Sequence, residues 1–209
     1  MSTLVVDLGT SPLCQTLVEP HALDRGEAHY PLSVYFCDAC FLVQLQEYVS
    51  PTEIFSDYPY FSSYSSSWIE HGRRYCEDIV DRLSLDGDSQ ILEVASNDGY
   101  LLKHFVDRGL TVLGVEPAEN VAQVAREAGV PTESFFFTER SALTLSKRCG
   151  KYDLIIGNNV LAHVPDINDF VAGLSVALQP GGTITLEFPH LLNLIEYNQF
   201  DTIYHEHFS

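Results

Sequence analysis

From about position 88 onward, short apolar runs alternate with longer stretches in which apolar residues recur at helical spacing. The short runs predict buried strands, and the stretches between them predict amphipathic helices. The predicted strands are 91–95, 112–115, 134–137, 152–156 and 183–188, and the predicted helices are 100–108, 118–128, 139–148 and 167–178. This alternation is typical of a parallel sheet covered by helices on both faces. We expect Pro180-Gly181-Gly182 to end the last helix before the last strand.

The first 67 residues have a different pattern, rich in aromatic residues and interrupted by prolines. Strand-like runs occur at 31–36 and 41–45, which indicates a small, loop-rich unit. Apolar residues at helical spacing over 68–85 then predict an amphipathic helix that leads into the second domain. The sequence therefore predicts one domain at 1–67 and an α/β domain at 68–209.

Residues 90–102, QILEVASNDGYLL, combine a buried strand, a tight turn and the start of a helix. This is the geometry that holds a nucleotide-like cofactor. The apolar run 111–115 is followed by Glu116, 23 positions after Glu93, and its carboxylate is placed to bind both hydroxyls of a ribose. The pair of motifs predicts an adenosyl cofactor. The alternative is an ordinary strand–turn–helix unit without a ligand.

The turn decides which adenosyl cofactor is expected. A pyrophosphate needs several closely approaching glycines, but here Gly99 is present while Ala95 and Asn97 stand at the other glycine positions. NAD and FAD are disfavoured, and the phosphate-free S-adenosylmethionine fits better. We expect Glu93 to order the turn, and Asn97 with the backbone around Gly99 to meet the methionine part.

Ligands of open parallel sheets collect at the carboxyl ends of the strands. The candidate ligand-binding residues therefore follow the predicted strands, at 96–100, at 116–117, at 157–163 and from 189 onward. Asn158, Asn159 and His163 form the most polar of these strand exits. The alternative for them is helix capping by Asn and a surface His.

The composition limits the choice of partners. The 209 residues carry 29 acidic and 11 basic side chains, a formal charge of -18, which would repel nucleic acid and anionic membranes. A nucleotide-linked substrate stays possible because backbone donors or one local Arg can hold a diphosphate. The sequence has neither an apolar run of about 18 residues nor a basic and apolar leader, so we expect a cytoplasmic protein. It does not predict an oligomeric state.

Five cysteines, an odd number, fit a reducing compartment better than a disulfide framework. Cys37 and Cys40 have the spacing of half a tetrahedral zinc site, because a closed structural site needs four ligands. Zinc and a plain pair of thiols are equally compatible with this pattern. Cys14 lies 23 residues upstream of Cys37 and could contribute a third ligand, whereas Cys76 and Cys149 have no Cys-x-x-Cys spacing.

The chain closes with YHEHFS at 204–209, which offers general bases near neutral pH, a phenol and a carboxylate that could orient an imidazole. His205 and His207 could also be metal ligands, but their spacing of two is not the spacing of four that aligns two His on a helix. A surface cluster without a role is the remaining alternative.

Five separated motifs in this order resemble the sugar C-methyltransferases, which act on nucleotide-linked keto-hexoses in deoxysugar pathways. They are Cys37-x-x-Cys40 with LVQL at 42–45, YPYFSS at 58–63, EVASNDGYLL at 93–102, GNNVLAH at 157–163 and YHEH at 204–207. The resemblance implies a Rossmann-like class I methyltransferase domain with a parallel-rich sheet after a small zinc-type domain. It also implies methyl transfer to a carbon alpha to a ketone, through an enolate that a His base forms, and a role in antibiotic or other deoxysugar biosynthesis.

The same resemblance assigns residues. It implies His207 as the base, Tyr204 and Glu206 as orienting groups, Asn159 and His163 as hydrogen-bond partners of the substrate, and Tyr58 as a group that closes over the pocket. The aromatic faces of Tyr60 and Phe61 could favour a cationic sulfonium by about 0.5–2 kcal/mol; core packing is the alternative. The cofactor-binding residues expected are Phe61, Ser63, Glu93, Ala95, Ser96, Asn97, Gly99, Tyr100, Glu116, Pro117, Asn158, Asn159 and Leu161. The metal ligands expected are Cys37 and Cys40.

The chain departs from the family at both ends. A first Cys-x-x-Cys pair and a C-terminal α/β domain that helps to bind the nucleotide sugar are expected but absent, so the sequence indicates a truncated chain whose activity and zinc binding are open. Two other functions are compatible with the same cofactor-binding motifs. One is an O- or N-methyltransferase for a small molecule, and the other is an inactive cofactor-binding remnant.

Overall fold

The computed structural model describes residues 2–55 and 58–209, and these form two compact units. The first unit gathers residues 2–54, 161–165 and 188–209. The second gathers Phe55, 58–160 and 166–187. Among the described residues the strands form a three-stranded sheet, β1-β2-β3, and a five-stranded sheet, β6-β5-β4-β7-β8.

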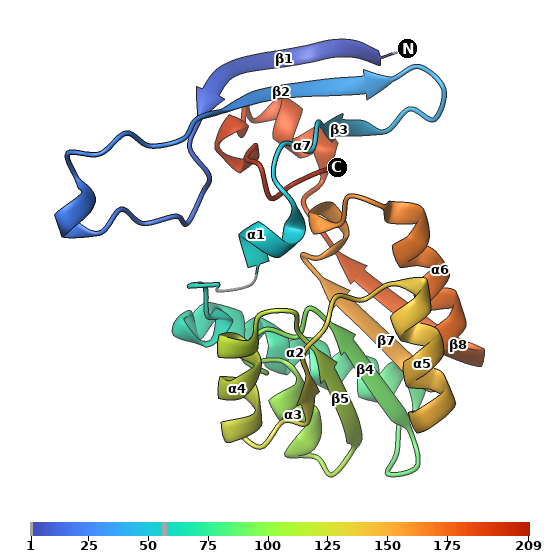
Figure 1. The fold of residues 1–209 in the computed structure, drawn as a ribbon. Helices are drawn as coiled ribbons and strands as arrows, with labels where there is room; N and C mark the ends of the chain where they lie inside the picture. Colours follow the sequence, from blue (N-terminus) through green and yellow to red (C-terminus); the bar gives the residue numbers. More distant parts are fainter. Residues whose placement is uncertain (1, 56–57) are drawn as a thin grey trace. The chain divides into compact units, whose positions relative to one another are not determined.

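The five-stranded sheet is parallel throughout its described pairs (Figure 1). Its strands are β4 (Gln90–Val94), β5 (Thr111–Val115), β6 (Thr132–Glu133), β7 (Tyr152–Asn158) and β8 (Leu178–Glu187). β4 lies between β5 and β7, so the chain leaves β4 in one direction and later returns on its other side. The carboxyl ends of β4, β5 and β7 therefore meet at one edge of the sheet, where α/β proteins bind ligands.

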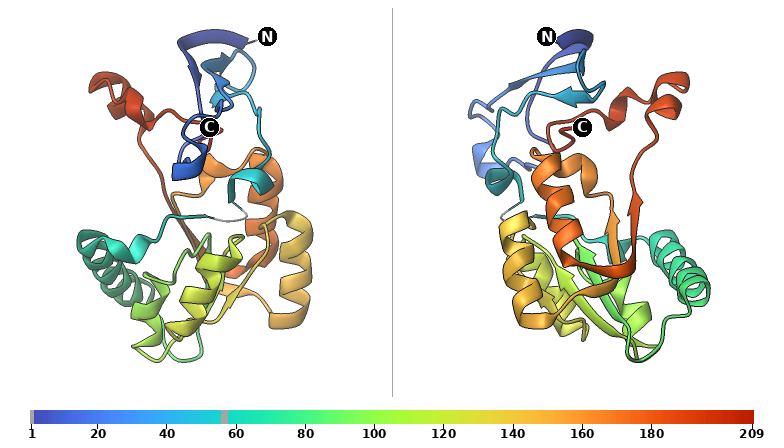
Figure 2. Two further views of the ribbon diagram at one scale, coloured as in Figure 1. Left: turned by 60° about the vertical axis from the view of Figure 1, so that its left-hand side comes forward. Right: turned by 90° about the vertical axis from the view of Figure 1, so that its right-hand side faces the viewer.

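Helices cover both faces of this sheet. They are α2 (Ser66–Leu83), α3 (Leu102–Val106), α4 (Glu119–Glu127), α5 (Glu139–Cys149) and α6 (Ile167–Ala177), with the 3₁₀ turn η2 (Ser62–Tyr64) before α2. α5 and α6 pack on the face opposite α2 (Figure 2). The expected α/β fold, a parallel sheet preceded by a small N-terminal unit, is confirmed.

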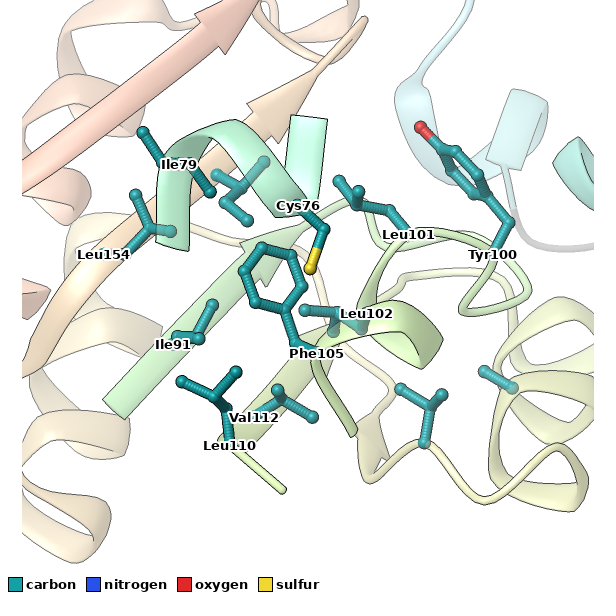
Figure 3. Packing of buried hydrophobic residues seen from close by; sticks show 13 residues of the cluster. Cys76, Ile79, Ile91, Tyr100, Leu101, Leu102, Phe105, Leu110, Val112 and Leu154 are labelled. Carbon is teal, nitrogen blue, oxygen red and sulfur yellow. The ribbon is translucent and has the colours of Figure 1, made fainter. Parts of the chain in front are cut away.

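One hydrophobic cluster fixes the β4–α3 connection. Phe105 of α3 is fully buried at its centre, among Cys76 of α2, Ile91 of β4 and Val112 of β5 (Figure 3). Truncating such a ring to Ala costs about 3–5 kcal/mol of folding free energy. The cluster therefore holds the start of α3, and with it the turn after β4, firmly against the sheet.

Two predicted strand limits were wrong. The strand expected at 134–137 is β6 at Thr132–Glu133, because Gly114 and Val115 of β5 pair with these two residues. Phe137 instead packs edge-on against Phe170 of α6, with ring centroids 5.7 Å apart.

The last strand begins earlier than expected. Helix α6 ends at Ala177, and β8 already starts at Leu178, so Pro180-Gly181-Gly182 lies inside the strand. Tyr152 pairs with Leu178 but Leu154 pairs with Thr183, and the extra residues of β8 bulge out between these pairs. Gly181 takes the left-handed conformation at φ 84° that the bulge requires.

The first unit contains the antiparallel sheet of β1 (Ser2–Ser11), β2 (Tyr30–Cys37) and β3 (Val43–Leu45). The limits of β2 and β3 differ from the expected ones, 31–36 and 41–45, by at most two residues. Phe41, expected in the second strand, lies in the turn between them with φ 64°. β1 was missed, as were the short helices. These are η1 (Pro20–Ala22), η3 (Leu161–His163), α7 (Leu191–Glu196) and η4 (Phe200–Thr202) in this unit, and α1 (Pro51–Phe55) that follows β3. Among the described residues, the helices are all too short or too polar to cross a membrane.

Candidate functional site

The turn after β4 has the backbone of a glycine-rich loop but mostly other residues. Ala95, Asn97 and Gly99 have φ values of 58°, 50° and 79°. L-residues rarely adopt this left-handed region, so the first two positions are strained in a way that a glycine would avoid. A Cβ on Gly99 would lie 3.0 Å from Val130 and 3.2 Å from Ala125, so this glycine also allows the turn to pack closely beside α4. Such strain is typical of ligand-binding turns.

Glu116 connects the ends of β4 and β5. Its Oε2 accepts a hydrogen bond from the Asn97 N–H at 3.0 Å, and its Oε1 accepts one from the Ala118 N–H at 2.9 Å. Burial raises the pKa of Glu116 to about 7, although these two N–H groups pull it down. A carboxylate accepts further donors through its remaining lone pairs, so Glu116 can hold the two hydroxyls of a ribose.

Glu93 is buried to 1% exposure at the end of β4. Its burial raises its pKa well above the ordinary value, and the nearby Glu116 and Asp98 raise it further. Within residues 2–55 and 58–209, Oε2 of Glu93, Oγ of Ser96 and Oδ1 of Asp98 are buried without a hydrogen-bond partner. Unpaired buried acceptors are costly and call for a donor. The ammonium and hydroxyl groups of S-adenosylmethionine supply such donors, so these residues fit that cofactor.

The Asn97 side chain forms hydrogen bonds with the protein backbone. Its carboxamide accepts from the Ser62 N–H at 2.8 Å and donates to the Tyr60 carbonyl at 3.2 Å. The neighbouring Asp98 accepts from the Ser63 N–H at 2.9 Å. The predicted cofactor residues Phe61 and Ser63 thus lie on a segment that is bonded to the turn after β4.

The third strand exit carries Asn158 and Asn159. The Asn158 side chain bonds to the Tyr100 hydroxyl, whose pKa burial raises, and the Tyr100 ring stacks on Trp68 with centroids 6.2 Å apart. Asn159 is left-handed at φ 51° and donates its N–H to the Glu187 carbonyl at 2.7 Å. The cap of the next α-helix, α6, is Asp166 and neither of these Asn residues.

Pro117, the other predicted residue at the second exit, accepts a hydrogen bond from the Ser134 hydroxyl at 3.1 Å through its carbonyl. The second unit therefore brings most of the predicted cofactor residues to one sheet edge. Leu161 belongs to η3 and to the first unit.

The first unit brings the predicted catalytic residues of the tail together with His163. The rings of His163 and His207 meet edge to face with centroids 4.7 Å apart, and the Tyr204 ring lies 4.1 Å from that of His207. Nδ1 of His163 is 3.9 Å from Oε2 of Glu206, which is 1% exposed. We call these four residues the tail cluster.

Both imidazoles of the tail cluster are held neutral. Burial and the nearby His207 lower the pKa of His163 to about 3, and burial lowers the pKa of His207. Nδ1 of His207 lies 2.7 Å from the Thr202 carbonyl, which can only accept, so Nδ1 carries the proton. Nε2 of His207 then holds the free lone pair, which is the form a general base needs.

His205, the other imidazole of the motif, has a different environment. Its Nε2 bonds to the Pro31 carbonyl at 3.1 Å, and its ring meets that of Tyr30 edge-on. His205 is 6% exposed. It therefore anchors the tail to β2.

The two predicted metal ligands form an incomplete site. Cys37 and Cys40 flank the turn between β2 and β3, and backbone N–H groups of Cys40 and Ala39 lower the pKa of Cys37. No group of three or more Cys, His, Asp or Glu side chains in the described part of the chain is arranged to hold a metal. Cys14, considered as a third ligand, donates its S–H to Oε1 of Glu206 at 2.8 Å. These residues do not fit a closed zinc site.

Sequence reasoning missed Asp98 and Asn120 as residues that organise the site. Asp98 stands between two predicted site residues, so its position in the motif was a usable signal. Asn120 bonds to the backbone of Tyr58, 62 positions away, and nothing local in the sequence marks that contact.

Two family models match the chain. Residues 68–209 match a methyltransferase domain, and residues 1–55 match a family described as "Putative zinc binding domain". The C-methyltransferase NovU of Streptomyces niveus is 38% identical over 205 residues, which cover 98% of this chain and 49% of that protein. A ubiquinone biosynthesis O-methyltransferase of Bordetella avium is 30% identical over 105 residues, 48% of this chain and 42% of that protein. The chain spans about half the length of the curated relatives it matches.

Solved structures share the fold. The PH0226 protein of Pyrococcus horikoshii superposes with a TM-score of 0.53 at 21% identity, over 74% of this chain and 66% of that one. An S-adenosylmethionine-dependent methyltransferase of Clostridium acetobutylicum gives 0.50 at 14% identity, over 62% of this chain and 54% of that one. Both likenesses concern the fold.

Proposed function

This chain belongs to the methyltransferase family, and we propose that it transfers a methyl group from S-adenosylmethionine to a carbon alpha to the ketone of a nucleotide-linked keto-deoxysugar. The observation that carries this proposal is the tail cluster, in which a neutral His207 is held beside His163, Tyr204 and Glu206. The likeness to a C-methyltransferase over 98% of the chain supports the same proposal.

The donor is assigned to the sheet edge of the second unit. Glu116 would accept from the ribose hydroxyls, and the buried Glu93 would accept a charged donor after losing its proton. When bound, S-adenosylmethionine supplies an electrophilic methyl on a sulfonium. The resemblance of the motifs assigns further residues to the donor: Phe61, Ser63, Ala95, Ser96, Asn97, Gly99, Tyr100, Pro117, Asn158, Asn159 and Leu161.

The base step is assigned to His207. A proton on a carbon next to a ketone would move to Nε2 of His207, and the electron pair of the C–H bond would form an enolate. With the donor bound, the enolate carbon would form a bond to the methyl carbon as the C–S bond breaks, and S-adenosylhomocysteine would leave with that electron pair. Nδ1–H stays on the Thr202 carbonyl, which fixes the ring and supports the positive charge as it forms. The low pKa keeps His207 unprotonated and ready at neutral pH.

Neighbouring groups are assigned to the oxygen of the enolate. A neutral His163 would donate one N–H, and the Tyr204 phenol would offer another donor. The resemblance of the motifs adds the Asn159 carboxamide as a hydrogen-bond partner of the substrate. Glu206 would orient His163. The resemblance of the motifs assigns Tyr58 to close over the substrate pocket. Positioning and general base catalysis each contribute ~10²-fold or more, which is why their removal is measurable.

Zinc carries no step of this proposal. The substrate and the antibiotic or deoxysugar pathway come from the resemblance of the motifs, and the C-methyltransferase name of the relative from Streptomyces niveus agrees with them.

O-methylation of a small molecule is the second candidate, favoured by the likeness to an O-methyltransferase over 48% of the chain. Incubation with carbon-13 methyl-labelled S-adenosylmethionine and a panel of nucleoside-diphosphate-linked keto-deoxysugars separates the two. We expect the label on a carbon next to the former ketone, and a label on oxygen would overturn C-methylation.

A further inference from the structure

Residues 58–63 form a segment that we call the aromatic strap, because it carries Tyr58, Tyr60 and Phe61. The ring of Tyr58 lies 5.5 Å from that of Phe55 and 6.2 Å from that of Tyr60. The aromatic strap ends in η2, where the Phe61 ring lies 5.5 Å from that of Tyr64. It has little regular secondary structure of its own, so side chains elsewhere must fix its path.

Asn97 and Asp98 bind one end of the aromatic strap. As described above, they accept the N–H groups of Ser62 and Ser63, and Asn97 also donates to the Tyr60 carbonyl. Ser62 is buried to 5% exposure, so its N–H has no access to water as a substitute partner. This end of the strap is therefore tied to the turn after β4.

Asn120 binds the other end. Its Oδ1 accepts from the Tyr58 N–H at 3.3 Å, and its Nδ2 donates to the Tyr58 carbonyl at 2.9 Å. One carboxamide thus satisfies both backbone groups of one residue, as a neighbouring strand would. Asn120 lies in the first turn of α4, which begins at Glu119 directly after the loop that carries Glu116. This end of the strap is tied to the exit of β5.

The same contacts reach the residues assigned to the donor. Asn97 holds the aromatic strap with its side chain, and its N–H donates to Glu116. If the aromatic strap were loose, the Asn97 side chain would lose its partners. Asn97 lies in the turn that carries Gly99 and donates to Glu116, so both parts of the donor site would be held less firmly.

We propose that Asn120 and Asn97 are positioning residues, which fix the aromatic strap across the exits of β4 and β5 so that it forms one wall of the donor site. This inference rests on the proposed use of S-adenosylmethionine, and it adds Asn120 to the residues on which donor binding depends. Neither residue needs to touch the reacting atoms.

Asn120→Ala tests the proposal, with Gln123→Ala as the matched control. Gln123 is exposed on the same helix, and its side chain donates to Glu127, four residues further along. Two measurements apply to each variant: exchange of the Ser62 and Ser63 amide hydrogens, and affinity for S-adenosylhomocysteine by isothermal titration. We expect Asn120→Ala to speed the exchange and weaken the affinity by about tenfold, since it removes two hydrogen bonds. Gln123→Ala should match the wild type in both.

Asn120→Asp gives a graded check. An Asp keeps the acceptor for the Tyr58 N–H and loses the donor to the Tyr58 carbonyl, so its affinity should fall between wild type and Asn120→Ala. If the substitutions only destabilised the protein, the melting temperature would fall, but the affinities would not decrease in the order wild type, Asn120→Asp, Asn120→Ala.

The proposal is overturned if Asn120→Ala keeps wild-type affinity, or if the amides of Ser62 and Ser63 exchange as slowly as before. This outcome is distinct from failure of the proposed function, which is read from the atom that receives the methyl and not from donor affinity.

Discussion

Cys14 and Glu206, 192 positions apart in the chain, are joined by a hydrogen bond in which the thiol donates to Oε1 at 2.8 Å. Burial raises the pKa of Cys14, and the carboxylate raises it further, so the thiol keeps its proton at neutral pH. The other oxygen of Glu206 faces His163 at 3.9 Å. The N-terminal segment after β1 is thereby linked to the tail cluster within the first unit.

Cys14→Ala should destabilise the protein, because the buried Glu206 loses a donor. We expect the free energy of unfolding in urea to fall by about 1–3 kcal/mol. Cys14→Ser keeps a hydroxyl donor and should recover part of this loss. Cys149→Ala, at an exposed thiol, serves as the control and should stay within about 0.5 kcal/mol of the wild type. Equal stability of the Cys14→Ala and Cys149→Ala variants would show that the hydrogen bond contributes nothing.

Gly99→Ala should cost more stability than Gly109→Ala. Both glycines are left-handed, at φ 79° and 78°, so an Ala meets the same backbone penalty of about 1–2 kcal/mol at each. A Cβ at Gly109 has no heavy atom within 4 Å among the described residues, whereas one at Gly99 would press on Val130 and Ala125. We expect a further loss of about 1–3 kcal/mol for Gly99→Ala. Urea unfolding of both variants measures the difference, and equal losses would contradict the packing argument.

Donor affinity should rise with pH through the titration of Glu116. Its pKa is raised to about 7, and hydroxyl donors bind a carboxylate better than a carboxylic acid. Affinity for S-adenosylhomocysteine should therefore fall by up to about tenfold from pH 8 to pH 6, as the group takes up a proton.

The control for this pH effect is Glu119→Gln, a nearby exposed change that should leave the pH dependence intact. Glu116→Gln should remove the part of the pH dependence of affinity that comes from Glu116, and it should weaken binding at pH 8. An affinity that changes equally with pH in wild type and Glu116→Gln would exclude Glu116 as the titrating group.

The sequence predicted the second unit well because its signals are local. The apolar runs of β4, β5 and β7 are continuous, as buried parallel strands require, and the caps of α2 and α6 are Ser65 and Asp166, ordinary helix-start residues. It failed at β6, whose two residues are selected by pairing with β5. It also failed at β1, whose residues are mostly exposed and lack a clear alternation.

The site was predicted in the same uneven way. Glu93 lies near the end of β4, and Gly99 and Glu116 follow β4 and β5, so all three can be located from the apolar runs of the sequence. The partners of Asn97, Asn120 and Cys14 are 35, 62 and 192 positions away, and such contacts depend on the folded chain. Ala95 and Asn97 were recognised as standing at glycine positions of the motif, but their left-handed backbone was not predicted, because residues other than glycine rarely adopt it.

The most direct test of the proposed reaction separates the base from the donor site. Deuterium uptake from heavy water at the carbon next to the ketone of a nucleotide-linked keto-deoxysugar reports proton removal, and methyl transfer reports turnover. In His207→Asn we expect both rates to fall by ~10²-fold or more, with affinity for S-adenosylhomocysteine within about twofold of wild type, since His207 is assigned no contact with the donor. His190→Asn, at an exposed residue before α7, should behave as wild type. Wild-type rates in His207→Asn would contradict the account.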